Sequence, residues 1–258
     1  MNDVNPILGY NRAELCMDSE TKKLNWYYYR KADGCNDKTI CQYMRIDYLI
    51  SLLETEEYYV NRRKEFDDAN DSYKNFKLAF GFSPVGDNVI PKISIQDRWI
   101  PYSDIVKCPT SCWSMKDRES YLMWKCYATE MGASIKTTIH NFIASLKIDL
   151  SRSNKDNKVL CGSVNYVEDY RHSTIEEKQL FDKDIVYADE EEFRFYFHLK
   201  SDTDNNSKGL RIPVNTKVMI DKVVLSPFIC KSASVQIAKF LNSNYGVDVE
   251  LSNIKVSL

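Results

Sequence analysis

The stretch from Cys112 to Thr138, CWSMKDRESYLMWKCYATEMGASIKTT, constrains the fold most, because it joins a helix pattern directly to a strand pattern. Ser114 followed three residues later by Asp117 resembles a capping box and predicts a helix start. Apolar side chains then recur at three- and four-residue spacing, and Gly132 stands where a helix commonly ends. These apolar positions are Leu122, Met123, Trp124, Cys126, Tyr127 and Met131. Residues 133 to 139 are rich in β-branched side chains and predict a strand that follows at once.

Further helix and strand patterns occur on both sides of this stretch. Residues 45 to 54 place five apolar side chains on one helical stripe, and the aromatic run at 24 to 29 predicts a buried strand. The remaining predicted helices are 140 to 148, 173 to 181 and 230 to 244, and the remaining strands are 58 to 61, 159 to 166, 190 to 199, 218 to 225 and 247 to 251. This order is too irregular for a doubly wound parallel sheet. It predicts one α+β domain over residues 24 to 258, with a mixed or mostly antiparallel sheet, after an irregular lead-in over residues 1 to 23.

The charge of the chain gives no general attraction to nucleic acid, because the net charge is −2. Local basic runs at residues 61 to 64, NRRK, and at residues 29 to 31, YRK, could contact nucleic acid or could form a solvated face.

Several features predict a cytoplasmic protein without a membrane partner. The first residues lack a charged lead and an apolar core of signal-peptide length, and no window approaches the roughly 18 apolar residues of a membrane span. The eight cysteines are therefore expected to be reduced thiols. Cys35, Cys41, Cys108 and Cys112 could form a structural zinc site, although no CxxC pair or neighbouring histidine completes such a pattern.

Common catalytic motifs are missing from the sequence. The eight glycines include no GxG pair, which excludes a Rossmann fingerprint and a P-loop. The chain also has no GxSxG elbow, no HExxH motif and only three histidines. Ordinary nucleotide-binding folds and histidine-based triads are therefore not expected.

The segment from Glu190 to Leu199, EEEFRFYFHL, alternates between aromatic and charged side chains. In a strand this alternation would place Glu190, Glu192 and Arg194 on one face. The charged face could be a functional surface. It could equally be the solvated face of an amphipathic edge strand.

The chain resembles a widespread bacterial family known only as a domain of unknown function. The resemblance covers about residues 24 to 252 and rests on motifs in the expected order. They are YYYR (Tyr27 to Arg30), YYVNRRKEFDD (Tyr58 to Asp68), CWS through MWxxY to TT (Cys112 to Thr138), VNY (Val164 to Tyr166), ExExR (Glu190 to Arg194) and IDKVVLSP (Ile220 to Pro227). This family implies no particular activity.

A second resemblance is to ADP-ribosyltransferases, which hold NAD in a split sheet without a glycine-rich loop. It rests on an arginine that ends an aromatic strand, a central strand with Ser or Thr, nearby aromatics and a late ExE strand. The resemblance implies that Arg30, beside Tyr29, would lie against the NAD phosphates, because a guanidinium matches phosphate oxygens. Ser114 or Thr137 would supply the strand hydroxyl, and Trp124 or Tyr127 a face for the nicotinamide.

The same resemblance implies that Glu192 carries the main step. Cleavage of the nicotinamide glycosidic bond builds positive charge on the ribose, which a fixed carboxylate stabilises. Glu190 would orient or deprotonate the acceptor, and Arg194 completes the ExExR face. Glu191 would point with the phenylalanines unless a bulge exchanges the roles.

These residues lead to an expected function and two alternatives. The expectation is an NAD-cleaving enzyme that modifies a macromolecular acceptor, nucleic acid or protein, as a bacterial toxin or anti-phage effector with a neutralising partner protein. One alternative is a metal-dependent nuclease in which Asp67, Asp68, Glu190 and Glu192 hold Mg²⁺. The other is a non-catalytic module whose aromatic and basic face binds nucleic acid or protein.

Overall fold

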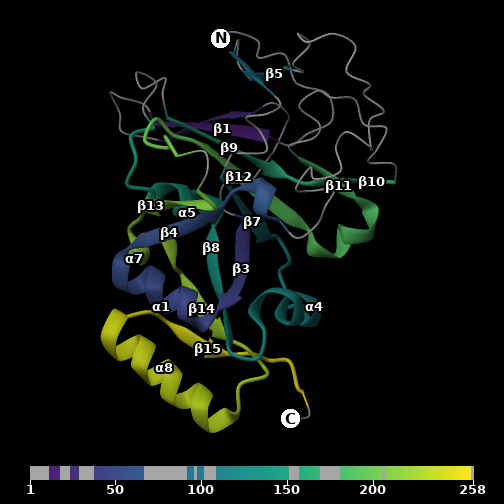
Figure 1. The fold of residues 1–258 in the computed structure, drawn as a ribbon. Helices are drawn as coiled ribbons and strands as arrows, with labels where there is room; N and C mark the ends of the chain where they lie inside the picture. Colours follow the sequence, from purple (N-terminus) through teal and green to yellow (C-terminus); the bar gives the residue numbers. More distant parts are fainter. Residues whose placement is uncertain are drawn as a thin grey trace. The chain divides into compact units, whose positions relative to one another are not determined.

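The computed structural model describes residues 12–17, 24–28, 38–66, 92–95, 98–101, 109–150, 157–168, 181–204 and 207–256 (Figure 1). The chain forms two compact units, each assembled from separate segments. The first unit comprises Met1–Ala32, Val60–Ser111 and Asp149–Leu210, and the second comprises Asp33–Tyr59, Cys112–Ile148 and Arg211–Leu258. Among the described residues, no helix is long and apolar enough to cross a membrane.

The second unit is built on a mixed, mostly antiparallel sheet in the strand order β15-β14-β8-β3-β7. These strands are β3 (Thr39–Arg45), β7 (Thr110–Ser114), β8 (Gly132–Thr138), β14 (Lys222–Leu225) and β15 (Val249–Leu251). β8 pairs antiparallel with both β3 and β14, whereas β14 and β15 are parallel. The predicted α+β class with a mixed sheet is confirmed.

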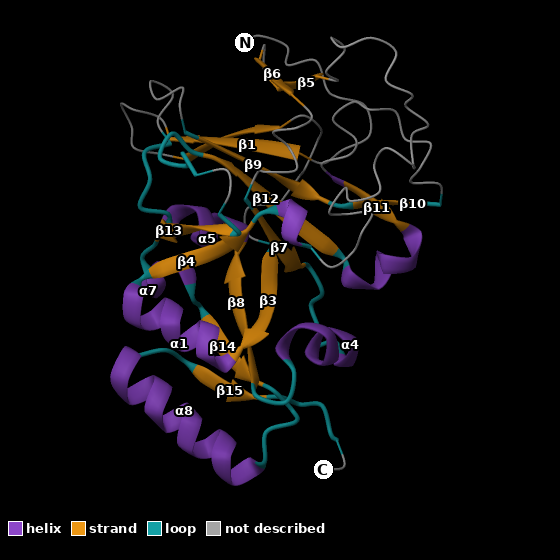
Figure 2. Ribbon diagram, in the orientation of Figure 1, coloured by secondary structure: helices purple, strands orange, loops and turns teal. Residues whose placement is uncertain are grey.

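Helices flank this sheet, as Figure 2 shows. They are α1 (Ile46–Thr55), α4 (Tyr121–Met123) with the π-helical turn η2 (Trp124–Ala128), α5 (Ile139–Ser145), α7 (Thr216–Met219) and α8 (Lys231–Tyr245). α1 buries Leu49, Leu52 and Leu53, the stripe expected from the sequence. It ends at Glu56, which adopts the left-handed conformation and donates its amide to the Leu52 carbonyl at 2.9 Å.

Successive side chains of β3 point to opposite faces of the sheet. Cys41 and Tyr43 pack against Trp124, with the rings of Tyr43 and Trp124 edge-on at 4.8 Å. Gln42, which alternation directs to the opposite face, accepts a hydrogen bond from the Tyr58 hydroxyl at 2.8 Å. The Tyr58 ring in turn contacts Phe142 at 5.5 Å, which extends the aromatic core on that face.

The first unit contains the strand order β12-β9-β1-β2 and two small sheets, β10-β11 and β5-β6. Its strands are β1 (Arg12–Met17), β2 (Leu24–Tyr28), β5 (Lys92–Ile95), β6 (Arg98–Pro101), β9 (Lys158–Ser163), β10 (Asn165–Val167), β11 (Asp182–Asp184) and β12 (Glu192–His198). Two 3-10 helices also occur. η1 (Arg63–Glu65) follows β4 (Glu57–Asn61) in the chain, and η4 (Ile185–Glu190) precedes β12. β4 pairs with β13 (Gly209–Pro213) in a further two-stranded sheet. In the described residues, β12 pairs with β9, β9 with β1, and β1 with β2, and all three pairings are antiparallel.

The helix predicted to start at Ser114 differs most from the structure. Ser114 is the last residue of β7, and the helical segment begins only after Ser120, whose hydroxyl accepts the Met123 amide at 3.4 Å. Gly132 is the first residue of β8. A Cβ at Gly132 would collide with Ala128, so the glycine is needed for close packing and not for a helix cap.

The other predicted elements match in part. Helices predicted at 45 to 54, 140 to 148 and 230 to 244 correspond to α1, α5 and α8. The predicted strand at 159 to 166 is interrupted at Val164 into β9 and β10, and α7 occupies the start of the strand predicted at 218 to 225. Strand β1 lies inside the lead-in that was expected to be irregular. The helix predicted at 173 to 181 lies outside the described residues except for Phe181.

Candidate functional site

β12 of the first unit places Glu192, Arg194 and Tyr196 on one face and three phenylalanines on the other. Residues 192 to 197 are buried on both faces. β12 pairs with β9 along one edge, and the amide of Phe197 donates to the Pro109 carbonyl at 3.0 Å. The charged side chains are therefore not the solvated face of an edge strand, which corrects that alternative.

Glu192 and Arg194 form a two-bond ion pair inside the first unit. Nε of Arg194 donates to Oε1 of Glu192 at 2.7 Å, and Nη2 donates to Oε2 at 2.9 Å. Arg194 is 0 % exposed and Glu192 is 3 % exposed. Such a pair fixes the plane of the carboxylate, because the guanidinium fork matches both of its oxygens.

Lys183 of β11 joins this pair to Glu190. Its Nζ donates to Oε2 of Glu190 at 2.6 Å and to Oε2 of Glu192 at 3.3 Å. Both carboxylates of the ExE motif thus share one ammonium group. Lys183 is itself buried, and its Nζ lies 4.6 Å from the ring centroid of Tyr187.

The backbone at Glu191 makes this shared contact feasible. Glu191 adopts the left-handed conformation, with φ 45° and ψ 55°, between the end of η4 and the start of β12. Glu190 is therefore not part of the strand, contrary to the expected alternation. The turn at Glu191 lets Glu190 and Glu192 approach the same lysine from different elements.

Tyrosines complete the buried group. The Tyr196 hydroxyl accepts a hydrogen bond from Nη1 of Arg63 at 2.7 Å and lies 3.5 Å from Nη1 of Arg194. The Tyr166 hydroxyl accepts the Glu192 amide at 2.8 Å, and burial raises the pKa of Tyr166. We call Arg63, Tyr166, Lys183, Glu190, Glu192, Arg194 and Tyr196 the ionic cluster.

Arg62, next to Arg63 in the chain, has internal partners of its own. Its guanidinium donates to both oxygens of Asp202, at 2.9 and 2.5 Å, and to the carbonyls of Asp204 and Ser207. Arg62 and Arg63 are 1 % and 0 % exposed. The predicted solvated face over residues 61 to 64 is therefore wrong for these two arginines, because internal acceptors replace their water.

The other predicted site residues belong to the second unit or lie outside the described residues. Ser114, Trp124 and Thr137 are buried in the second unit, and Tyr127 is exposed there. Nε1 of Trp124 donates to Glu119 at 3.1 Å, and its burial leaves no face of the indole open to a ligand. Tyr29 and Arg30 lie outside the described residues.

Four residues of the ionic cluster were not predicted as site residues from the sequence: Arg63, Tyr166, Lys183 and Tyr196. Tyr196 shares the alternation of Glu192 and Arg194, which was an available signal. Arg63 lies 133 positions before its partner Tyr196, so no local pattern could reveal that contact.

No three His, Cys, Asp or Glu side chains converge as a metal site in the part of the chain that the structure describes. Asp67 and Asp68, named for the nuclease alternative, lie outside the described residues, as do Cys35 and Cys108 of the zinc alternative. Within the described ranges, Cys41 and Cys161 are buried, Cys112 is half-buried, and Cys126 and Cys230 are exposed.

Comparisons with known proteins add no relative. No protein-family model matches the chain, and no curated protein sequence matches it. Both resemblances described from the sequence therefore stay expectations, and the ionic cluster has to be interpreted from its own chemistry.

Proposed function

We propose that the protein is an ADP-ribosyltransferase-like enzyme, with an ADP-ribosyltransferase-type split sheet. In this proposal it cleaves NAD as its substrate and transfers ADP-ribose to nucleic acid or protein. The observation that carries the proposal is the arrangement of Glu190 and Glu192 around one ammonium group, with Glu192 fixed by the Arg194 fork. A role as a toxin or anti-phage effector with a neutralising partner follows only from the resemblance.

The fixed carboxylate suits the bond-breaking step. Departure of nicotinamide leaves oxocarbenium-like positive charge on the ribose, and a carboxylate at that position stabilises the transition state more than the ground state. The Arg194 contacts at 2.7 and 2.9 Å prevent rotation of the Glu192 carboxylate. Preorganisation of this kind avoids the cost of reorienting the group during the reaction.

Lys183 provides the means by which a substrate hydroxyl reaches Glu192. Its contact with Glu192, at 3.3 Å, is the longer of its two carboxylate contacts, and its contact with Glu190 is 2.6 Å. A ribose hydroxyl can replace the longer contact while Lys183 remains paired with Glu190. Because Glu192 is 3 % exposed, this step requires Lys183 to move away from Oε2.

In the proposal, Glu190 acts on the acceptor. Its side chain is 12 % exposed, compared with 4 % for the side chain of Glu192. A more accessible carboxylate beside the reaction centre can orient an acceptor group or take its proton. The proposal therefore gives the two glutamates different tasks.

A non-catalytic binding module is the second candidate, and the burial of Arg194 supports it. A guanidinium and carboxylate that satisfy each other inside a protein can also serve as a scaffold. In that case the ionic cluster would shape a recognition surface without turnover.

The test uses the full chain with labelled NAD and a cell lysate. Nicotinamide release and label transfer are measured for the wild type, for Glu192→Gln and Glu190→Gln, and for Glu191→Gln as a matched control on an exposed neighbour. We expect both activities in the wild type and the control, loss of both in Glu192→Gln, and loss mainly of transfer in Glu190→Gln.

Circular dichroism and thermal unfolding establish that each variant is folded. Because Glu192→Gln leaves Arg194 without its charged partner, the more accessible Glu190→Gln serves as the second test if Glu192→Gln unfolds. Absence of NAD cleavage by the wild type with every lysate fraction would overturn the transferase proposal. Binding of nucleic acid or protein without turnover would then favour the module.

A further inference from the structure

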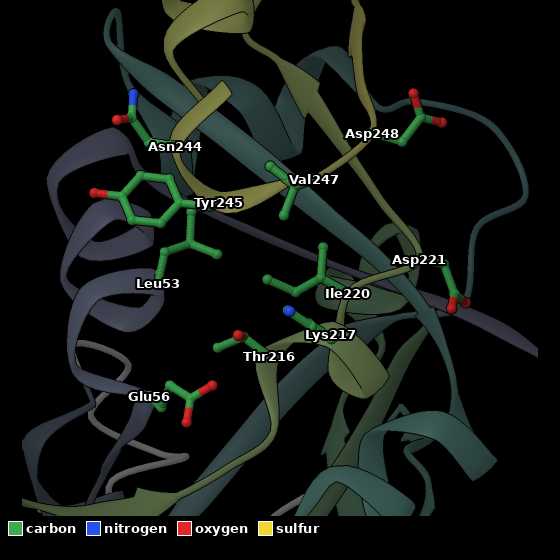
Figure 3. A pocket seen from close by; sticks show the side chains of 11 residues that line it. Leu53, Glu56, Thr216, Lys217, Ile220, Asp221, Asn244, Tyr245, Val247 and Asp248 are labelled. Atoms are coloured by element: carbon green, nitrogen blue, oxygen red, sulfur yellow. The ribbon is translucent and has the colours of Figure 1, made fainter. Parts of the chain in front are cut away.

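The second unit contains a cavity of about 730 Å³, shown in Figure 3. Its lining comes from the end of α1, from α7 and the residues after it, and from the end of α8 and the segment that leads to β15. Small-molecule sites commonly have volumes of about 300 to 1,000 Å³. The cavity is therefore large enough for a small organic ligand.

Three aliphatic side chains lie in the middle of the cavity, beside the Lys217 side chain (Figure 3). Leu53, Ile220 and Val247 line the cavity and are themselves almost completely buried in the fold. Figure 3 shows their side chains gathered in the middle of the lining. This surface favours contact with a hydrocarbon segment of a ligand.

Carboxylates lie on both sides of this aliphatic middle. Figure 3 shows Glu56 on one side and Asp221 and Asp248 on the other. Among the lining residues that the structure describes, three carry carboxylates and one, Lys217, carries an ammonium group.

The contacts of the carboxylates leave the side with the two aspartates more negative. Glu56 accepts a hydrogen bond from Nζ of Lys147 at 2.6 Å. Asp221 accepts from the neutral amide of Asn141 at 2.8 Å. Lys222 lies 4.0 Å from Asp248 but 2.6 Å from Glu250, so its charge is mainly engaged by Glu250.

Two helix ends add to the negative potential. Glu56 and Gly246, the residues that cap the C-termini of α1 and α8, both line the cavity. The C-terminus of a helix carries partial negative charge and attracts cations. Neither helix has a basic residue in its last turn, although Lys147 offsets the charge at the end of α1 through its bond with Glu56.

We propose that this cavity binds a linear aliphatic polyamine. Its methylene chain would cover Leu53, Ile220 and Val247, and its terminal ammonium groups would lie near Glu56 at one end and near Asp221 and Asp248 at the other. The proposal concerns only the second unit and does not use the ionic cluster, so it stands apart from the proposed NAD chemistry.

Isothermal titration calorimetry of the full chain with spermidine tests the proposal. The double variant Asp221→Asn/Asp248→Asn removes two carboxylates from the lining, and Asp117→Asn/Glu130→Gln removes two exposed carboxylates of the same unit outside it. Both variants change the net charge equally. We expect about tenfold weaker binding for the first and unchanged binding for the second.

Two further variants and one ligand control sharpen the result. Lys217→Gln removes the competing ammonium group and is expected to tighten binding. Asn244→Trp places a bulky ring at the exposed rim of the cavity and is expected to weaken binding. Butylamine, with one charge, should bind more weakly than spermidine. Equal weakening by the two double variants, or full binding by Asn244→Trp, would overturn the proposal, as would absence of spermidine binding by the wild type.

Discussion

The two units treat charged side chains in opposite ways. The first unit buries Arg63, Lys183, Glu192 and Arg194, each less than one tenth exposed. The second unit leaves its ion pairs in water: Lys147 with Glu56 has side chains 47 % and 45 % exposed, and Arg45 with Asp47 has side chains 56 % and 52 % exposed. Ion pairs of the same chemical kind are thus buried in the first unit and exposed in the second.

This difference bears on why the ionic cluster exists. Exposed ion pairs contribute little to stability. In a buried ion pair, the free-energy cost of desolvating the two charges offsets much of their Coulomb attraction. Aliphatic side chains of similar volume could often replace a buried pair without loss of stability. Stability alone therefore does not explain these buried charges, and the proposed NAD chemistry would give them a role.

The largest effect is expected when one member of the buried pair is removed. Arg194→Met should lower the free energy of unfolding by about 3 to 5 kcal/mol, because Glu192 then remains buried without its fork. Urea unfolding measures the change. The double variant Arg194→Met/Glu192→Leu should recover most of this free energy. If Arg194→Met lowered the free energy of unfolding no more than the loss of an exposed ion pair does, the buried and exposed pairs would not differ in energy.

An intermediate effect is expected at Glu119, a half-buried carboxylate of the second unit. It accepts hydrogen bonds from Nε1 of Trp124 at 3.1 Å, from the Ser252 hydroxyl at 2.5 Å and from the Asn253 amide at 2.9 Å. Glu119→Ala should cost about 2 kcal/mol, because it leaves the Trp124 donor without its acceptor. Urea unfolding gives the energy, and hydrogen exchange should become faster at Asn253. Ser252→Ala, which removes one of the three bonds, should cost less.

The smallest effect is expected at the exposed Lys222–Glu250 pair. The hydrogen bond from Lys222 lowers the pKa of Glu250, and that bond also raises the pKa of Lys222. The stability from the pair is therefore lost as pH falls through the lowered carboxylate pKa, and again as pH rises through the raised lysine pKa. Melting temperatures of wild type and Lys222→Met should differ slightly at neutral pH and low salt, and should converge at acid pH and at high salt. A difference that persists under those conditions would mean that the pair is not acting through charge.

The sequence was sufficient for features that depend on neighbouring residues. The apolar stripe of α1 and the shared face of Glu192 and Arg194 both follow from residue spacing. The start of the helix after Ser114 was predicted wrongly, because β7 continues through Ser114 and Ser120 supplies the cap. A capping pattern cannot by itself tell which of two serines begins a helix.

The candidate site was predictable only as a set of residue types on one strand. The left-handed turn at Glu191 separates Glu190 from β12, and a non-glycine residue in that conformation gives no sequence signal. Burial of the face depends on partners distant in the chain, such as Arg63 for Tyr196. These contacts arise from tertiary packing, which residue periodicity does not encode.

The bonds between Arg62 and Asp202 have a consequence for how the protein is made. They join positions 140 residues apart, and the first unit consists of three separate segments interleaved with those of the second. A ribosome must therefore add Asp202 and the residues around it before Arg62 meets its acceptors, so the first unit completes late in synthesis. A nascent chain that ends before Asp202 would leave the guanidinium of Arg62, buried in the finished protein, without its acceptors on Asp202 and Asp204.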